Sequence, residues 1–236
     1  MKKSYILLCL LAVVLVGCGK NTGRTLTSAT GSIYECLVVM NENPLTQEQL
    51  NEIAKLSLVN EASGYTEPIT TTYDLVEAVM GADMPCMPQV EPYFRLTHVP
   101  TAQFDDMFKP TRNILFVDIN PQKYTQLKAK VSNDYWSTPQ AICRIQSPSE
   151  EEFVAYWLEH GTEIREWFVN QEIKRQMKFY RASTNKEART ILQKQGYDML
   201  IPEDYIVIMD TTLGGATTYS LRNPITVAPE VRLLWC

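Results

Sequence analysis

Apolar stretches between residues 33 and 147 predict four strands. "IYECLVVM", residues 33–40, is almost continuously apolar and lies between "TGS" and "NENP", as in a central strand covered on both faces. Three further stretches predict strands by their apolar content and partial alternation; they are Tyr93–Val99, Arg112–Ile119 and Gln140–Gln146.

Capping signals predict helices between these strands. Thr46 with Gln49 forms a capping box before a helix that reaches about Asn60, and a short helix follows in "YDLVEAVM". Asn120 with Pro121 predicts another helix through "QKYTQLKAKVSNDYW". The order strand, helix, strand, strand, helix, strand predicts an α+β, ferredoxin-like (split β-α-β) antiparallel sheet over residues 33–147, with helices on one face.

A helical segment and the start of a second α/β half are expected over residues 148–212. Ser149 with Glu152 forms a capping box at the head of a long helix that carries an aromatic stripe. Thr184 with Glu187 predicts the cap of a second helix ending near Gly196, and "YIVIMD" predicts a strand. Residues 213–236 show no periodicity and are expected to form an irregular tail. Because they end in the apolar "RLLWC", we expect a truncated or rearranged reading frame.

The first residues indicate an export signal. Lys2 and Lys3 precede an apolar run of about a dozen residues, whereas a membrane-spanning helix needs about 20, which disfavours the alternatives of a buried helix or a short anchor. "LVGC", residues 15–18, resembles the bacterial lipobox. That resemblance implies removal of residues 1–17 and lipid on Cys18, with residues 18–32 as lipidated cysteine and flexible tether. Two or more acyl chains make a stable anchor.

Net charge and cysteine spacing disfavour two functions, nucleic-acid binding and zinc binding. The chain has 22 Lys and Arg against 27 Asp and Glu, a net charge of −5, which disfavours nucleic-acid binding. No basic stripe for anionic headgroups is expected, so we expect membrane contact through lipid alone. With no C-x-x-C and two distant histidines, a zinc site is not expected.

Two parts of the sequence are candidate recognition surfaces, a proline-rich loop and an aromatic stripe on the long helix. The loop "GADMPCMPQVEP" is long and rigid enough to be a recognition loop, through Met84, Pro85, Met87, Pro88 and Gln89. The aromatic stripe could be a binding surface, although helical spacing more often marks a core; its residues are Tyr156, Trp157, Trp167 and Phe168.

Two polar features of the long helix favour structural roles. His160, with Glu159 and Glu163, is one histidine on its helix, which favours a half-buried structural role over a metal or general-base role. Glu150, Glu151 and Glu152 fit the first turn of a helix.

A family resemblance rests on the order of several stretches. These are the lipobox cysteine, "GSIYECLVV", "MPQVEPYFRL", "RNILFVDI", "PQAICRIQSPS" and "IPEDYIVIMDTT". From about Ser28 to Thr212 the chain resembles Bacteroidales envelope lipoproteins known only as domain of unknown function 4837. Members of that family continue past the point where this chain ends. The resemblance implies a location in the cell envelope and a fold, but no catalytic residues.

The sequence therefore predicts a membrane-anchored lipoprotein of the cell envelope, on the outer membrane facing the periplasm. We expect a non-catalytic binding or structural module with no cofactor and an envelope protein as a partner. The alternative is an envelope hydrolase acting on peptide or glycan, which would need a pocket with several ionisable side chains.

The topology makes a specific prediction about Cys36 and Cys143. In a ferredoxin-like domain the first and fourth strands are adjacent and antiparallel, and alternation puts both cysteines on the helix-covered face. We expect packed thiols rather than a cross-strand disulfide, because buried free cysteine behaves as a small hydrophobe.

Overall fold

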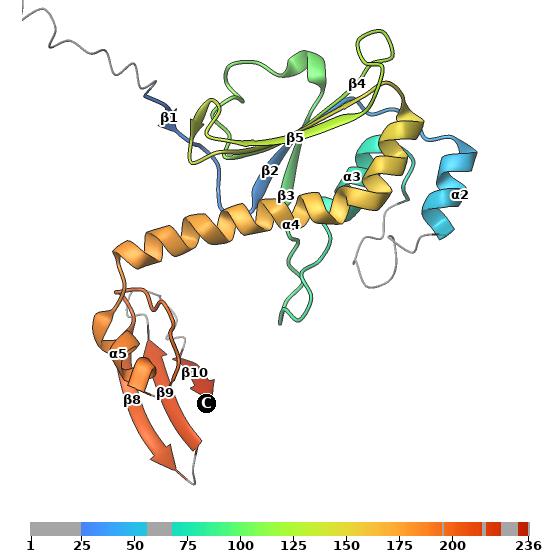
Figure 1. Ribbon diagram of the computed structural model, residues 1–236. Coiled ribbons are helices and arrows are strands. Elements are labelled where there is room, and N and C mark those ends of the chain that lie inside the picture. The colour runs from blue at the N-terminus through green and yellow to red at the C-terminus, as the bar shows by residue number, and fades with distance from the viewer. Residues whose placement is uncertain (1–24, 56–67, 195, 214–215, 223–230, 236) are drawn as a thin grey trace, which may run out of the picture.

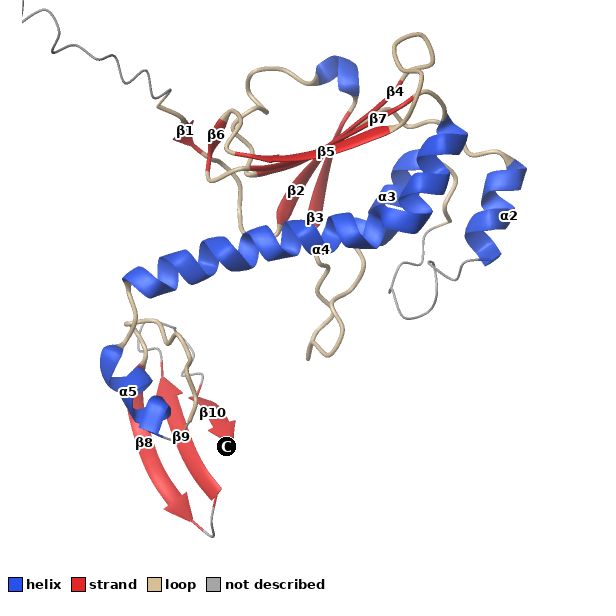
Figure 2. Ribbon diagram, in the orientation of Figure 1, coloured by secondary structure: helices blue, strands red, loops and turns tan. Residues whose placement is uncertain are grey.

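The computed structural model describes residues 25–55, 68–194, 196–213, 216–222 and 231–235. The predicted signal segment and Cys18 lie outside the described residues. A five-stranded mixed sheet is the centre of the fold, with helices on one of its faces (Figures 1 and 2). Its strands are β2 (Glu35–Val39), β3 (Arg95–Val99), β4 (Asn113–Ile119), β5 (Lys128–Asn133) and β7 (Ala141–Ser147). The expectation of an α+β fold is confirmed.

The strand pairing differs from the ferredoxin-like prediction, which is wrong. The sheet order is β3-β2-β4-β7-β5; β2 pairs parallel with both β3 and β4, and β4 pairs parallel with β7. Only β5 runs antiparallel, along the free side of β7. Near-continuous apolar strands suit such a parallel sheet because both faces of its central strands are covered.

The predicted helix after Asn120 is replaced by a turn and a strand. The Asn120 side chain accepts hydrogen bonds from the backbone N–H groups of Gln122 and Lys123, at 2.9 and 3.1 Å, and closes a turn. The chain then forms β5, paired with β7 from Lys128↔Gln146 to Asn133↔Ala141. Pairing with a buried strand therefore outweighs the local helix signals.

Three helices cover one face of the sheet or flank it: α2 (Gln47–Lys55), α3 (Thr72–Met80) and α4 (Glu150–Ala182). The Thr46–Gln49 capping box is confirmed, with both reciprocal hydrogen bonds present. Ser149 caps α4 by accepting from the N–H of Glu152. Helix α4 crosses the whole sheet and extends beyond it (Figure 1).

The main core lies between the sheet and helices α3 and α4. Trp157, Phe153 and Phe168 of α4 are fully buried there with Phe94 and the inward side chains of the strands. Burying such side chains stabilises the fold by roughly 1.5–3 kcal/mol each.

Cys36 and Cys143 lie in this core as free thiols, so the predicted shared face and packed thiols are confirmed. Their predicted adjacency is wrong, because β4 lies between β2 and β7. Burial raises the pKa of both thiols, to about 12 for Cys143.

A buried ionic cluster fixes α4 against the sheet. Glu172 is fully buried, and its carboxylate accepts from the guanidinium of Arg112 at 2.6 and 2.9 Å. It also accepts from Asn113 at 2.7 Å and from Arg175 at 2.8 Å. A buried carboxylate is tolerated only with such a complete set of partners.

The opposite face of the sheet has a second, smaller core. Leu37, Val39, Val99, Ile114 and Ile142 form it. The segment after β3, which includes the short 3₁₀ helix η1 (Thr101–Gln103), packs Phe104 and Phe108 over it, and Trp136 adds a third ring. The two-residue strands β1 (Thr27–Ser28) and β6 (Ser137–Thr138) pair in parallel, and Thr30 pairs with Thr111. The prediction of a flexible tether over residues 18–32 is therefore wrong for this part of it.

The C-terminal part forms a separate small unit at the far end of α4 (Figure 1). Helix α5 (Lys186–Lys194) packs Ala188 and Leu192 on Ile201, and a three-stranded antiparallel sheet follows. Its strands are β8 (Ile206–Leu213), β9 (Ala216–Arg222) and β10 (Val231–Trp235). The predicted strand at "YIVIMD" is present, but the prediction of an irregular segment over 213–236 is wrong for β9 and β10. The side chain that caps α5 is Asn185 rather than Thr184.

Candidate functional site

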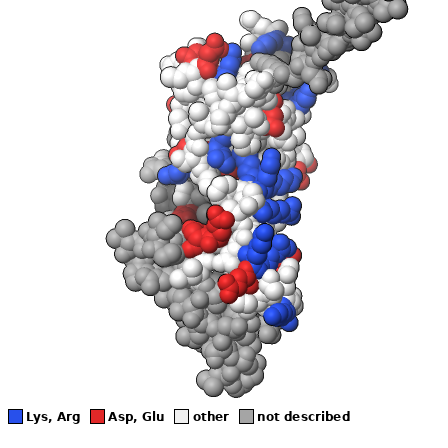
Figure 3. Space-filling view, turned by 90° about the vertical axis from the view of Figure 1, so that its left-hand side faces the viewer, with Lys and Arg blue, Asp and Glu red and all other residues white. Residues whose placement is uncertain are grey.

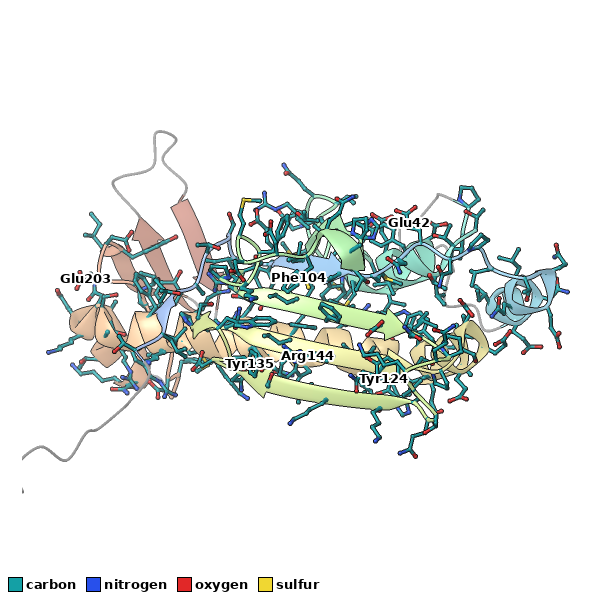
Figure 4. The ribbon with its side chains drawn as sticks, turned by 90° about the horizontal axis from the view of Figure 1, so that it is seen from above. Glu42, Phe104, Tyr124, Tyr135, Arg144 and Glu203 are labelled. Carbon is teal, nitrogen blue, oxygen red and sulfur yellow. The ribbon has the colours of Figure 1, made fainter. Side chains whose placement is uncertain are left out.

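A cleft of about 340 Å³ lies on the less covered face of the sheet, over the carboxyl-terminal halves of β4 and β7. Figure 4 looks down on this face and labels Phe104, Tyr124, Tyr135 and Arg144 there. In sheets with parallel strands, ligands commonly bind outside the carboxyl ends of the strands. The cleft is lined by Thr101, Phe104, Phe116, Asp118, Lys123, Tyr124, Trp136, Arg144 and Gln146.

Strand alternation places the polar groups of the cleft side by side. Phe116 and Asp118 of β4 lie opposite Arg144 and Gln146 of β7 in the register of the two strands. All four share the face of Ile114 and Ile142, because side chains two residues apart point to the same side. The apolar first half of each strand thus builds the small core, and the polar second half builds the cleft.

Asp118 is held by two neighbours from the turn after β4. Lys123 Nζ lies 2.7 Å from its Oδ2, and the Tyr124 hydroxyl donates to the same oxygen at 2.5 Å. Gln146 in turn donates to the Tyr124 oxygen at 3.1 Å. Burial tends to raise the pKa of Asp118, but the hydrogen bonds and charge of Lys123 and Tyr124 outweigh it, so the pKa lies below its usual value. Asp118 is therefore an ionised hydrogen-bond acceptor at neutral pH.

Arg144 is held by aromatic rings instead of by a carboxylate. Its guanidinium carbon lies 4.6 Å from the ring centre of Tyr135 and 4.9 Å from that of Trp136. Its guanidinium forms no hydrogen bond or ion pair with the described residues. Cation–π contacts of this kind hold the guanidinium at the two rings and leave its five N–H donors unused.

Aromatic side chains form the wall beside Arg144. Phe104 packs edge-on against Phe116, with ring centres 5.5 Å apart, and lies 5.6 Å from Trp136. These rings are half-buried, so part of each remains open to a ligand. The cleft combines ring surfaces, a free guanidinium and a polar hydrogen-bond network.

A second hollow, of about 680 Å³, lies between α2 and the first half of α4. Val154, Ala155 and Leu158 make its apolar wall, and four glutamates line it: Glu48, Glu52, Glu151 and Glu159. The Gln49 amide nitrogen is buried in this region without a hydrogen-bond partner among the described residues. The two hollows therefore differ in chemistry, one being aromatic and basic and the other aliphatic and acidic.

Residues 50–181, more than half of the chain, match the model of a family described as Domain of unknown function (DUF8532). The chain belongs to this family. The matched span contains every residue of the cleft and nearly all of α4. No curated protein and no solved structure matches the chain.

The predicted recognition loop is exposed but lies away from the cleft. Between α3 and β3 it projects below the sheet in Figure 1, closed at its base by pairing of Asp83 with Pro92. Met87 is 42% exposed, and the neighbouring Cys86 is an exposed free thiol. Met84, Pro85, Pro88 and Gln89 belong to the same projection, which adds no side chain to either hollow.

The predicted aromatic binding surface is core, as helical spacing favours. Trp157 and Phe168 are fully buried, so their assignment to a surface is wrong. Tyr156 and Trp167 are partly buried against the same cluster. The Trp157 indole donates to the backbone oxygen of Leu75 at 3.2 Å, which joins α4 to α3.

His160 is half-buried, as expected for a structural histidine. Its ring lies 3.1 Å from a Glu163 carboxylate oxygen and packs against Tyr156. Within the described ranges, no three His, Cys, Asp or Glu side chains are grouped to hold a metal ion. None of the helices described in the structure is both long and apolar enough to cross a membrane.

Sequence reasoning missed the cleft because it assigned residues 121–136 to a helix. That assignment removed Lys123, Tyr124 and Trp136 from consideration as neighbours of the sheet. A usable signal was present in "FVDI" and "CRIQ", where charged or amide side chains alternate with buried apolar residues in the second half of each strand.

Proposed function

We propose that this protein is a non-catalytic, lipid-anchored module of the cell envelope whose cleft binds an acidic saccharide. The observation that carries the proposal is Arg144, whose guanidinium lies against the rings of Tyr135 and Trp136 and has no carboxylate partner among the described residues. An oriented, unpaired guanidinium suits a planar carboxylate or a sulfate, which it can bind with two parallel hydrogen bonds.

The walls of the cleft fit the rest of such a ligand. The exposed parts of Phe104, Phe116 and Trp136 offer apolar surface to the C–H face of a sugar ring. Asp118, Tyr124 and Gln146 offer acceptors and donors for hydroxyl groups. A mostly apolar pocket with a few placed polar groups is typical of small-ligand sites, and about 340 Å³ lies within their usual range of roughly 300–1,000 Å³.

The carboxylate content of the cleft favours binding over hydrolysis. Glycoside hydrolysis usually uses two carboxyl groups, one of them with a raised pKa. Asp118 is the one carboxylate among the described residues of the cleft wall, and its pKa is lowered. The alternative of an envelope hydrolase therefore has weaker support.

The proposed location in the cell envelope rests on the N-terminal sequence. The basic start, the short apolar run and the lipobox-like "LVGC" support a diacylglycerol anchor on Cys18. The resemblance to family 4837 supports the envelope address, and "GKNTGR" after Cys18 has no acidic residue, which supports the periplasmic side of the outer membrane. A mass spectrum of the mature protein tests the anchor: acyl chains on Cys18 with loss of residues 1–17 are expected, and an intact signal would contradict it.

Isothermal titration calorimetry tests the cleft. The full chain is titrated with an oligosaccharide that contains glucuronic acid and with the matched neutral glucose oligosaccharide. We expect binding of the acidic ligand alone. Arg144→Met should lower its affinity at least about tenfold, since a charge-assisted pair contributes about 1.5–3 kcal/mol.

Arg95→Met is the matched control, because Arg95 is an exposed arginine on β3, at the opposite edge of the sheet. The Arg95→Met variant should bind the acidic oligosaccharide with the same affinity as the unsubstituted protein. Equal binding of acidic and neutral ligands, or equal losses in the two variants, would contradict the proposal.

A further inference from the structure

Helix α4 carries a row of basic side chains in the part that extends beyond the main core. Lys174, Lys178 and Arg181 are spaced four and three residues apart, so they lie on one side of the helix. All three are exposed. The sequence led us to expect no basic stripe for anionic headgroups, and this row was not considered there.

The row forms no ion pairs within the part of the chain that the structure describes. No ion pair joins Lys174, Lys178 or Arg181 to a carboxylate of the described chain. Arg175, in the same segment, differs because it turns inward to Glu172. Figure 3 shows several Lys and Arg side chains on this side of the molecule, with Asp and Glu side chains among them. The row is thus a local positive surface on a chain with a net charge of −5.

The beginning of the described chain is close to this row. Gly31 lies beside the Arg112 side chain, and Arg112 binds Glu172, two residues before Lys174. Gly31 comes thirteen positions after Cys18, so an anchor at Cys18 lies no more than about 45 Å from Gly31. An anchored molecule therefore keeps this surface within reach of the bilayer.

We propose that Lys174, Lys178 and Arg181 dock the protein on an anionic phospholipid surface and fix its orientation there. The inference rests on the proposed anchor at Cys18. A basic group near an anionic leaflet strengthens binding about fivefold, so three together contribute roughly 100-fold. The acidic remainder of the protein is repelled by the same leaflet, which makes the row the favoured contact.

Docking through α4 leaves the saccharide cleft free. Helix α4 covers one face of the sheet, and the cleft opens on the other. The two surfaces therefore act independently, and loss of one does not remove the other.

Amine labelling of the full-length protein on vesicles tests the docking. One vesicle type contains phosphatidylcholine alone, and the other contains about 30% phosphatidylglycerol, which supplies the anionic surface. A water-soluble acetylating reagent is applied, and mass spectrometry of peptides gives the labelling rate of each lysine. Lys128 and Lys130 of β5 are exposed lysines that serve as internal controls.

We expect the labelling rates of Lys174 and Lys178 to fall at least about threefold on anionic vesicles only, and to recover in about 0.5 M salt, which screens exposed charges. Lys128 and Lys130 should keep their rates. An equal change at all four lysines, or no change at Lys174 and Lys178, would overturn the proposal.

A variant with Lys174→Gln, Lys178→Gln and Arg181→Gln separates docking from anchoring. It should remain on the vesicles through its lipid but lose the preference for anionic lipid, whereas Lys128→Gln with Lys130→Gln should keep it. The mass of the same sample reports whether Cys18 is acylated. Protein without acyl chains still tests the row through the labelling rates, so failure of the anchor and failure of the docking give different results.

Discussion

The two faces of the central sheet have opposite characters although the same strands build both. The face toward α3 and α4 buries Val38, Leu115, Cys143 and Ile145 almost completely. The other face is partly covered by aromatic rings and carries Asp118 and Arg144 in the cleft beside them. The largest buried core therefore lies on one face, and the cleft that we propose as a ligand site lies on the other.

This difference explains which parts of the structure were predictable. Strands with apolar residues on both faces, such as "IYECLVVM", are visible in sequence because burial leaves few alternatives. The capping pairs Thr46–Gln49 and Ser149–Glu152 were predictable because each is a hydrogen-bond pattern between residues three apart in the sequence.

What the sequence did not reveal depends on contacts between distant segments. Parallel pairing of β2 with β3 and β4 is invisible in a local pattern, and the edge strand β5 exists because β7 offers it a partner. Arg144 becomes a candidate binding residue only when Tyr135 and Trp136 come to lie beside it. The basic row was overlooked because Lys174, Lys178 and Arg181 are not consecutive, and only the helix brings them together.

The largest effect is expected at the ionic cluster beneath α4. Glu172→Ala leaves Arg112 and Arg175 without their shared carboxylate, so the free energy of unfolding should fall by about 3–5 kcal/mol. Urea denaturation measures it. Glu166→Ala, at a half-exposed carboxylate of the same helix, should lower it by less than about 1 kcal/mol. Similar losses in both variants would show that Glu172 does not fix the helix.

Substitutions at two adjacent residues of β7 compare the two faces of the sheet directly. Ile145→Ala removes a fully buried side chain on the helix-covered face and should lower the free energy of unfolding by about 2–5 kcal/mol. Arg144→Met, on the other face, should change it by less than about 1 kcal/mol, because the side chain is partly exposed. The same denaturation experiment compares the variants, and a reversed order would remove the distinction between a stabilising and a recognising face.

A smaller, pH-dependent effect is expected on the covered side at the start of α3. Burial tends to raise the pKa of Asp74, but hydrogen bonds from Thr70 and Thr71 outweigh it and lower the pKa. A carboxyl group with a lowered folded-state pKa stabilises the protein above its ordinary pKa, near 4, and that contribution disappears as the pH falls through the folded-state value.

Asp74→Asn should therefore lower the free energy of unfolding by about 1 kcal/mol at neutral pH and reduce the loss of stability below about pH 4. Glu91→Gln, in the exposed loop before β3, is the surface control and should change the free energy of unfolding at neutral pH by less than about 0.5 kcal/mol. An unaltered acid profile in Asp74→Asn would contradict the assignment.

The most direct test of the account is a nuclear magnetic resonance titration that follows the tryptophan indole N–H signals. Trp136 lies in the aromatic wall of the cleft, whereas Trp157 is fully buried on the helix-covered face. On addition of the glucuronic acid oligosaccharide, the Trp136 signal should move in a saturable manner and the Trp157 signal should stay in place. A Trp136 signal that does not move at saturating ligand, or a Trp157 signal that moves with it, would contradict the claim that the aromatic, basic face is the one that recognises a ligand.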